Sequence, residues 1–447
     1  MRIGFLAMSG IRAHDPELLA LGLTLPGFVA RSKQIAALPS LGLLQLAACT
    51  PSGHELRYFE APADGAEPRD LYDCDLVAIS TFSAQIFEAY AIADRLRARG
   101  VKVAMGGLHV SVRPDEAADH ADYLVIGEGE VVWPEVVAAA ERGATSARFD
   151  GRAAGPVDLA TLPTPRYDLL AGRPYSRFTV QTSRGCPWRC EFCASTVMLQ
   201  QRYRHRPVAH VLRDIAAVHA VQPGAFIEFA DDNTFVDHAW SRELCAALEP
   251  LQMKWFTETD LSVADDPQLC DAIARSGCRQ LLIGLESPNE RALRGVEQRA
   301  DWKAHRARDY GRSLHELQSR GVTVNGCFVL GLDDHGPKIF AEVLDFAERH
   351  ALWEVQVTVL TPFPGTPLHE RLEREGRLLH PGRWERCTLF DVNYVPARMS
   401  VEQLRAGLRW LTERLYADDA LRRRRRAFLA RRRAARYGLA SSSRCAG

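Results

Sequence analysis

Three of the eleven cysteines are crowded into eight residues, and this crowding constrains the chain more than any other feature. Cys186, Cys190 and Cys193 follow a predicted strand with the spacing C-x3-C-x2-C. A loop this short can place three thiolates around one corner of a [4Fe–4S] cube and leave the fourth iron without a protein ligand. The alternative is a zinc knuckle completed by His205 and His210, but structural zinc prefers four closed ligands, usually as two separated pairs. The spacing therefore favours an open, catalytic cluster.

The 447-residue chain is 47% hydrophobic and 25% charged, which is typical of a globular protein with two or three domains. Its longest uncharged stretch, residues 34–53, is interrupted by prolines and polar residues and cannot supply a membrane span. The first eight residues lack the long apolar core of a signal peptide. We therefore expect a cytoplasmic protein with no membrane span, in which the cysteines are thiols, cofactor ligands or core residues rather than disulfides.

Short β-branched runs alternate with helical patterns through residues 1–143, which predicts a doubly wound, flavodoxin-like α/β domain with a parallel sheet. Ligands of such sheets bind at the carboxyl ends of the strands. Residues 144–176 lose this periodicity and collect Gly, Pro and Ala, so we expect a linker there. The strands are expected at residues 2–8, 56–59, 76–81, 101–105 and 123–126.

The alternation resumes over residues 177–366 as six strand–helix units. Six units are too few to close an eight-stranded barrel, so we expect a partial (β/α)6 TIM-like barrel with its active site at the carboxyl ends of the strands. A C-terminal extension with a helix is expected over residues 367–420. The six predicted strands lie at residues 178–182, 226–230, 254–257, 280–284, 323–329 and 354–360.

The net charge of zero hides a basic C-terminus, because residues 421–447 hold ten Arg and no acid while the other 420 residues carry a net charge of −10. We refer to residues 421–447 as the Arg-rich tail. Its Ala and Leu favour helix, so a solvated C-terminal helix is expected. With only Phe428 and Tyr437 as aromatic residues, the tail gives little indication of nucleic-acid binding.

The segment from Thr182 to Cys193 closely resembles the cysteine motif of the radical SAM superfamily. In that family the exposed iron is chelated by S-adenosylmethionine (SAM), and one electron cleaves SAM to methionine and a 5′-deoxyadenosyl radical. The resemblance implies a [4Fe–4S] cluster, SAM, and an electron donor such as flavodoxin or ferredoxin. Substrate orientation and exclusion of water are the tasks left to the protein.

Other residues match the positions of the family's SAM contacts, at the ends of predicted barrel strands or between two cluster cysteines. The resemblance implies that acids after the second strand accept from the SAM ammonium. It also implies that the fourth strand end contacts the ribose and carboxylate, and that an aromatic residue between two ligands lines the adenine. Glycines of the fifth strand would let the backbone approach the adenine. These candidates are Phe192, Asp231, Asp232, Asn233, Gly284, Glu286, Ser287, Gly331 and Thr361.

The N-terminal domain resembles the cobalamin-binding domain that is fused to many radical SAM enzymes. A hydroxyl pair, Ser80 and Thr81, and a glycine pair, Gly106 and Gly107, end neighbouring strands and would admit the nucleotide tail of cobalamin. The end of the following strand, at Gly127 and Glu128, would complete the binding edge of the sheet. No Asp-x-His-x-x-Gly sequence is present to supply a histidine on the cobalt. The alternative is a flavodoxin-like domain kept for structure or substrate binding. The candidates are Ser80, Thr81, Gly106, Gly107, His109, Gly127 and Glu128.

The resemblance spans nearly the whole chain, and residues 376–404 look like the extension of the cobalamin-binding subgroup that includes hopanoid methylases. It implies a cobalamin-dependent C-methyltransferase that acts on an unactivated carbon of a small-molecule or natural-product substrate. The deoxyadenosyl radical would abstract hydrogen, methylcobalamin would donate the methyl group, and a second SAM would restore it. One alternative is radical cyclisation, rearrangement or oxidation without methyl transfer. Another is a non-catalytic iron–sulfur or zinc protein whose Arg-rich tail binds nucleic acid.

Overall fold

A computed structural model describes residues 1–8, 10–21, 24–25, 38–62, 67–195 and 202–437. The chain divides into two compact units. The first comprises Met1–Gly185, Glu191–Phe226 and Thr361–Tyr394, and the second comprises Cys186–Cys190, Ile227–Leu360 and Val395–Gly447. In the part of the chain that the structure describes, none of the helices is long and apolar enough to cross a membrane.

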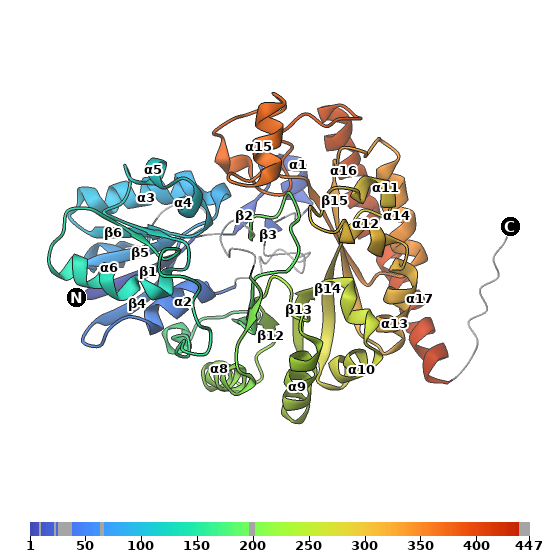
Figure 1. Cartoon of the computed structure of the whole chain (residues 1–447), viewed down its shortest axis with the longest axis horizontal. Helices are drawn as coiled ribbons and strands as arrows, with labels where there is room; N and C mark the ends of the chain where they lie inside the picture. The colour runs from blue at the N-terminus through green and yellow to red at the C-terminus, as the bar shows by residue number, and fades with distance from the viewer. Residues whose placement is uncertain (9, 22–23, 26–37, 63–66, 196–201, 438–447) are drawn as a thin grey trace. The chain divides into compact units, whose positions relative to one another are not determined.

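The first unit contains a six-stranded parallel sheet in the order β4-β1-β5-β6-β7-β8. The five predicted strands are confirmed, while β8 forms within the predicted linker. Figure 1 shows α3 and α4 along one face and α2 and α6 along the other. The bounds are β1 Arg2–Ala7, β4 Glu55–Glu60, β5 Leu76–Ser80, β6 Lys102–Gly106, β7 Tyr123–Ile126, β8 Ala147–Asp150, α2 Leu41–Ala48, α3 Ile86–Ala98, α4 Leu108–Val112, α5 Pro114–Ala117 and α6 Trp133–Glu141.

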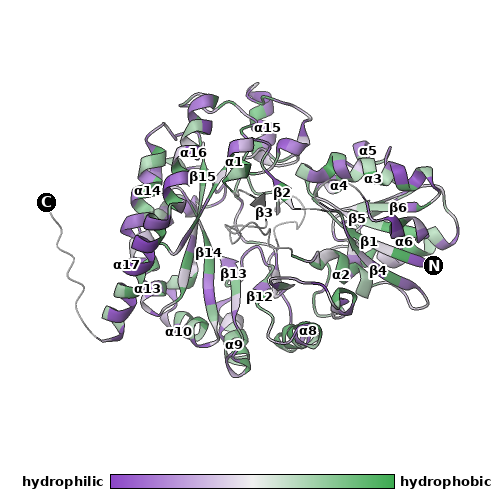
Figure 2. Ribbon diagram, turned by 180° about the vertical axis from the view of Figure 1, so that it is seen from behind, coloured by the Kyte–Doolittle hydropathy of each residue, from purple (hydrophilic) through white to green (hydrophobic). Residues whose placement is uncertain are grey.

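Helices on both faces explain why the central strands of this sheet are apolar at nearly every position. In β5, Leu76, Val77, Ala78 and Ile79 are all buried, and only the last residue, Ser80, is partly exposed. Figure 2 shows the same pattern, with hydrophobic residues concentrated on strands and on the helix sides that face them. The polar residues at the strand ends therefore stand out as candidates for ligand binding.

The second sheet also has six strands, in the order β16-β15-β14-β13-β12-β9, and β12 to β16 pair in parallel. All six predicted strands are confirmed, and the linear order of the sheet is that of an open, partial barrel. Helices α9, α10, α13 and α14 cover the outer side of β13 to β16 (Figure 1). The bounds are β9 Phe178–Val180, β12 Ile227–Phe229, β13 Trp255–Thr259, β14 Cys278–Glu286, β15 Thr323–Leu330, β16 Glu354–Val359, α8 Val208–Val221, α9 His238–Leu248, α10 Pro267–Arg275, α13 Tyr310–Ser319 and α14 Ile339–Arg349.

Two short helices, α11 (Glu290–Leu293) and α12 (Trp302–Ala307), connect β14 to α13. The C-terminal extension forms α15 (Pro367–Arg374) and α16 (Val401–Tyr416). A capping box starts α16, in which the Ser400 hydroxyl accepts from the backbone N–H of Gln403 and the Gln403 side chain accepts in return.

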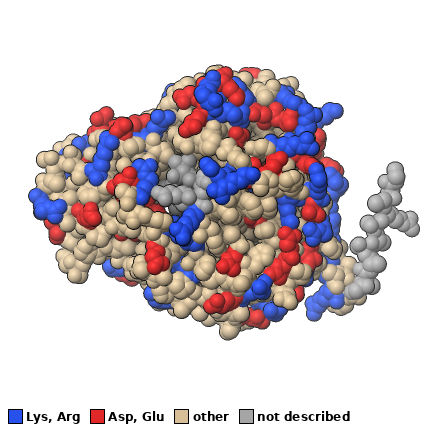
Figure 3. Space-filling model, viewed as in Figure 1, with Lys and Arg blue, Asp and Glu red and all other residues tan. Residues whose placement is uncertain are grey.

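The Arg-rich tail forms α17 (Asp418–Arg436), and its last ten residues lie outside the described part of the chain. The expectation of a helix is confirmed, but the expectation that it is solvated is wrong on its inner side. The Arg424 side chain is only 1% exposed, and its guanidinium donates to the carbonyls of Leu352 (3.0 Å) and Leu415 (2.9 Å). Phe428, one helical turn further on the same face, is 2% exposed. On the visible surface, basic and acidic side chains are interspersed rather than segregated (Figure 3).

Candidate active site

The loop that carries the first two cysteines begins with a turn that requires glycine. Gly185 has a φ of +87°, and a Cβ atom there would lie 2.4 Å from the carbonyl oxygen of Arg202. Cys186 and Cys190 are half-buried in the second unit. The Asn233 side-chain amide donates toward the Sγ atom of Cys186 at 3.8 Å, which favours an ionised, ligating sulfur.

The acidic segment after β12 joins the end of β13 through a buried hydrogen-bond network. Asn233 donates to Asp260 Oδ2 (2.7 Å) and accepts from the Thr259 hydroxyl (3.1 Å), while Asp231 accepts from the Thr234 hydroxyl (2.8 Å). Asp231 and Asn233 are almost fully buried, whereas Asp232 between them is half-buried. Among the three predicted SAM contacts in this segment, Asp232 therefore retains the most surface for a cationic ligand.

The end of β14 holds a buried ion pair that sequence reasoning missed. Glu286 adopts a left-handed conformation (φ 60°), and the ladder with β15 shifts register between Gly284 and Glu286. Lys303 from α12 donates to Glu286 Oε1 (2.8 Å) and to the Gly284 carbonyl (2.9 Å). Burial alone would lower the pKa of Lys303, but the charges of Glu286 and Cys190 raise it above its ordinary value. The ammonium therefore stays charged near Cys190.

Ser287 and Gly331 meet through a histidine that the sequence did not single out. The Gly331 N–H donates to His335 Nδ1 (3.2 Å), so His335 Nε2 carries the proton and donates to the Ser287 hydroxyl at 2.9 Å. Burial lowers the pKa of His335 to about 4, which keeps the ring neutral. This contact fixes the ends of β14 and β15 to each other.

The remaining barrel candidates belong to the first unit. Cys193 and Phe192 are half-buried, and the Sγ atom of Cys193 lies 3.2 Å from the Ser195 hydroxyl. Thr361, which follows β16, is buried. Within the second unit, the structure thus places Asp231, Asp232, Asn233, Gly284, Glu286, Ser287 and Gly331 at or just beyond the carboxyl ends of β12, β14 and β15. Cys186 lies against Asn233, and Cys190 forms a β-bridge with Glu297.

At the carboxyl edge of the first sheet, Ser80 and Gly106 are register partners at the ends of β5 and β6. Gly107 follows with a φ of +98°, and a Cβ atom there would lie 2.6 Å from the carbonyl oxygen of Thr81. Gly107 is therefore required by the domain's own backbone. Gly127 directly follows β7 and also has a positive φ, and its N–H donates to the Ser111 hydroxyl at 2.9 Å.

His109 does not face solvent at this edge. Its side chain is fully buried, Nδ1 lies 3.0 Å from the Ser83 hydroxyl, and Nε2 lies 3.3 Å from Glu116 Oε1. Trp384 covers the ring edge-on, with ring centroids 5.5 Å apart. Burial lowers the pKa of His109, although Glu116 opposes this. Both ring nitrogens therefore serve the packing of the domain.

Glu128 also has internal partners, two arginines that the sequence did not single out. Arg204 donates to Glu128 Oε1 at 2.6 Å and Arg184 at 2.8 Å, and the Val157 N–H donates to Oε2 at 2.7 Å. Burial would raise the pKa of Glu128, but the hydrogen bonds from Arg204 and Arg184 lower it to about 2. Glu128 thus anchors the strand that leads into the cysteine loop.

The residues present fit the three implied cofactors. In the residues that the structure describes, no three His, Cys, Asp or Glu side chains are arranged as a site for a metal ion. A [4Fe–4S] cube does not need such convergence, because its thiolates bind different irons. The acids at the ends of β12 and β14 suit the cationic SAM. At the first sheet, Phe82 after β5 is 56% exposed and Val131 after β7 is 36% exposed, which suits contact with a large organic cofactor.

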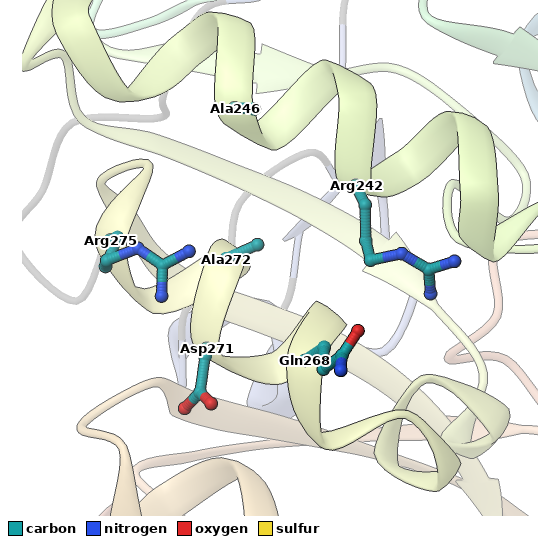
Figure 4. A pocket seen from close by; sticks show the side chains of 6 residues that line it. All are labelled: Arg242, Ala246, Gln268, Asp271, Ala272 and Arg275. Carbon is teal, nitrogen blue, oxygen red and sulfur yellow. The ribbon is translucent and has the colours of Figure 1, made fainter.

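A separate surface cavity of about 400 Å³ lies between α9 and α10 on the outer helical layer (Figure 4). Its two arginines already pair with carboxylates, Arg242 with Asp266 and Arg275 with Glu249. The cavity is lined by helix residues and by none of the strand-end candidates, so it is not part of the candidate site.

Comparison with known families assigns three stretches of the chain. Residues 180–347 match the radical SAM superfamily, residues 35–137 match the B12 binding domain, and residues 366–444 match a domain of unknown function, DUF4070. The predicted domain boundaries stay predictions, because they differ from these matches. The first two predicted domains, 1–143 and 177–366, are longer than their matches, and the predicted extension, 367–420, is shorter. The compact units follow neither set of boundaries.

Relatives and solved structures agree with this assignment. The bacteriochlorophyllide d C-12(1)-methyltransferase of Chlorobaculum tepidum is 26% identical over 392 residues, covering 86% of this chain and 84% of the relative. The hopanoid C-2 methylase of Rhodopseudomonas palustris is 25% identical over 353 residues, covering 77% and 66%. Among solved structures, the cobalamin-dependent SAM radical enzyme OxsB with aqua-cobalamin bound has the same fold, with a TM-score of 0.65 at 14% identity over 98% of this chain and 72% of that chain.

These matches are to enzymes, so the alternative of a non-catalytic iron–sulfur or zinc protein is set aside. The cofactors of this architecture are a [4Fe–4S] cluster, SAM and cobalamin. The chain therefore carries a radical SAM domain together with a B12-binding domain, and it resembles enzymes with this combination of cofactors, among them a hopanoid C-2 methylase.

Proposed function

We propose that this enzyme is a cobalamin-dependent C-methyltransferase that acts on an unactivated carbon of a small-molecule substrate. The observation that carries the proposal is the placement of two cluster cysteines and the acids of β12 and β14 in one compact unit of a chain that also has a B12-binding domain. Relatives named for methylation of bacteriochlorophyllide d and of hopanoids support it. When bound, the cofactors supply one-electron cleavage of SAM and a transferable methyl group.

The tasks of the chain's own residues follow from their positions. Cys186, Cys190 and Cys193 would hold the cluster. Asp232 would accept from the SAM ammonium, because it is the more exposed of the acids after β12. Glu286 would bind SAM with its position fixed by Lys303. Charge-assisted hydrogen bonds of this kind contribute about 1.5–3 kcal/mol each.

The remaining proposed SAM contacts are supplied by the neighbouring loops and strand ends. Phe192 would line the adenine, and Gly284, Ser287, Gly331 and Thr361 would border the ribose, carboxylate and base. At the first sheet, cobalamin would approach the edge marked by Ser80, Gly106 and Gly127. The internal bonds of Asp231, Asn233, Thr81, Gly107, His109 and Glu128 make these residues supports of the two sites.

The chemistry needs one electron from a partner, and we propose a small redox protein such as flavodoxin or ferredoxin. We also propose a cytoplasmic location, because no disulfide joins the ten cysteines of the described residues and thiols persist in a reducing compartment.

The test is anaerobic reconstitution with iron, sulfide and cobalamin, followed by incubation with SAM, a reductant and trial substrates. Bacteriochlorophyllide d and a hopanoid are the first substrates to try. The expected result is 5′-deoxyadenosine together with a product heavier by one CH2 group. The Cys186→Ala variant controls for cluster-independent SAM breakdown and should give neither product. Formation of 5′-deoxyadenosine with an altered substrate that has gained no CH2 group would instead establish radical chemistry without methyl transfer.

A further inference from the structure

A buried carboxylate lies against the cysteine loop and has no part in the proposed binding of SAM. Glu297, which follows α11, is 1% exposed. Its Oε1 atom accepts from the backbone N–H groups of Arg189 (3.1 Å) and Arg299 (3.0 Å). Its Oε2 atom accepts from the backbone N–H groups of Ala300 (2.9 Å) and Trp302 (3.4 Å).

This arrangement keeps a charge in the interior without a cationic partner. Burial would raise the pKa of Glu297, but the four backbone donors, led by Ala300 and Arg299, hold it below its ordinary value. Among the described residues, no Lys or Arg side chain forms an ion pair with it. Since desolvating a carboxylate is costly, it needs the complete set of donors to remain charged. One of those donors, Arg189, comes from the cysteine loop, so loop and carboxylate depend on each other.

The backbone around Arg189 is held on both sides by the segment that contains Glu297. The Arg189 N–H donates to the carboxylate, and the Arg189 carbonyl accepts from the Gln298 N–H at 2.9 Å. Cys190 itself forms an antiparallel β-bridge with Glu297. The residue before a cluster ligand and the ligand itself are therefore fixed by residues more than a hundred positions away, since Arg189 and Glu297 are 108 residues apart.

Two indole rings complete this attachment. Trp188 stacks on Trp302, with ring centroids 4.5 Å apart and an interplanar angle of 20°. The Trp188 N–H also donates to Asp260 Oδ2 at 2.6 Å. The loop from Trp188 to Cys190 thus has a set conformation in a region with almost no regular secondary structure of its own.

We propose that Glu297 is a positioning residue that holds Cys190 in the conformation in which it ligates the cluster. The inference rests on the proposed function only in that a cluster binds these cysteines; it does not depend on methyl transfer. A loop that is already ordered loses little conformational entropy when the cluster binds. Without the carboxylate, Arg189 loses its acceptor and the thiolate of Cys190 can leave its iron more readily.

The experiment compares wild type, Glu297→Ala and Glu297→Gln as reconstituted holoenzymes. The rate of iron loss to an excess of chelator is measured anaerobically, together with the electron paramagnetic resonance spectrum and midpoint potential of the reduced cluster. Loss of a charge-assisted hydrogen bond predicts about tenfold to hundredfold faster iron loss for Glu297→Ala. Glu297→Gln keeps one oxygen, which can accept from two of the four donors, so it should lie between wild type and Glu297→Ala. The matched control is Glu290→Ala, because Glu290 lies on α11 and its ion pairs among the described residues, with Arg308 and Arg294, are at the surface.

Iron loss and a cluster spectrum equal to wild type in Glu297→Ala would overturn the proposal. The proposal is also overturned if faster iron loss follows only from unfolding. In that case Glu297→Ala lowers the thermal midpoint of the apoprotein as much as it lowers that of the holoenzyme. If Glu297→Ala does not fold, the comparison of Glu297→Gln with Glu290→Ala decides. A wild type that holds its cluster but yields no methylated product would refute the proposed function and leave this inference standing.

Discussion

Replacing Lys303 with methionine tests the buried ion pair at the end of β14. The Lys303 and Glu286 side chains are 8% and 9% exposed, and their charged atoms lie 2.8 Å apart. Removing one partner of such a pair costs about 3–5 kcal/mol, because the other charge stays buried and uncompensated. The lost bond to the Gly284 carbonyl adds about 1 kcal/mol. We therefore expect Lys303→Met to lower the free energy of unfolding by about 4–6 kcal/mol near neutral pH.

The assay is urea unfolding of the apoprotein, followed by circular dichroism under anaerobic conditions. Neutral pH is appropriate because the folded-state pKa of Lys303 is raised. A group of this kind contributes its full stability below its unfolded pKa of about 10.4 and loses it only as pH rises through the folded value. The double variant Lys303→Met/Glu286→Gln removes both charges and should recover most of the loss.

The matched control is Arg308→Met, which removes the cation from a surface pair with Glu290 whose side chains are 65% and 31% exposed. Solvent-exposed pairs of this kind add little to stability, so this variant should remain close to wild type. The reasoning is refuted if Lys303→Met is destabilised no more than Arg308→Met. It is refuted equally if the double variant is as unstable as Lys303→Met alone.

Three further outcomes are expected. Glu128→Gln should lower the free energy of unfolding by about 3 kcal/mol at pH 7. This difference from wild type should shrink as pH falls from about 4 toward 2, because a carboxylate with a depressed pKa gives its full stabilisation only above that range. A difference in urea unfolding that is unchanged at pH 3 contradicts this. Arg424→Ala should lower the thermal midpoint, because the carbonyls of Leu352 and Leu415 lose their donor. Arg422→Ala, on the exposed side of the helix, should not lower it. Equal midpoints for the two variants would show that the buried face of α17 does not stabilise the fold. Labelling the protein with 15N-histidine should leave the electron paramagnetic resonance spectrum of bound cob(II)alamin unchanged, because His109 is buried with both nitrogens bonded and His120 pairs with Asp94. A superhyperfine splitting that changes with the label would place a histidine, rather than cobalamin's own benzimidazole, on the cobalt.

The strands were predictable because buried parallel strands are apolar along their whole length, and this pattern is local. β8 escaped detection because Ala147–Asp150 alternates partly buried and exposed residues at the sheet edge, within a stretch rich in Gly and Ala. The inner face of α17 has a sequence pattern that the nine arginines of the helix obscure. Leu421, Arg424 and Phe428 are spaced three and four residues apart, which is the spacing of one helical face, and all three are buried. The spacing of these residues therefore predicts the buried face of the helix, which the charged composition of the segment does not.

The cysteine motif predicts the cluster ligands but not the conformation that makes them ligands. The loop from Cys186 to Cys190 is held by Asn233 after β12, by Asp260 after β13, and by Glu297 after α11. These partners are 47, 72 and 108 residues from the loop positions they contact. The sequence singles out Asn233 only as a contact to SAM and gives no sign of Asp260 or Glu297, and only the parallel strand order brings these positions to one edge. The same C-x3-C-x2-C spacing in a chain without such partners would supply three thiols without a preformed loop, so the barrel is part of the cluster site.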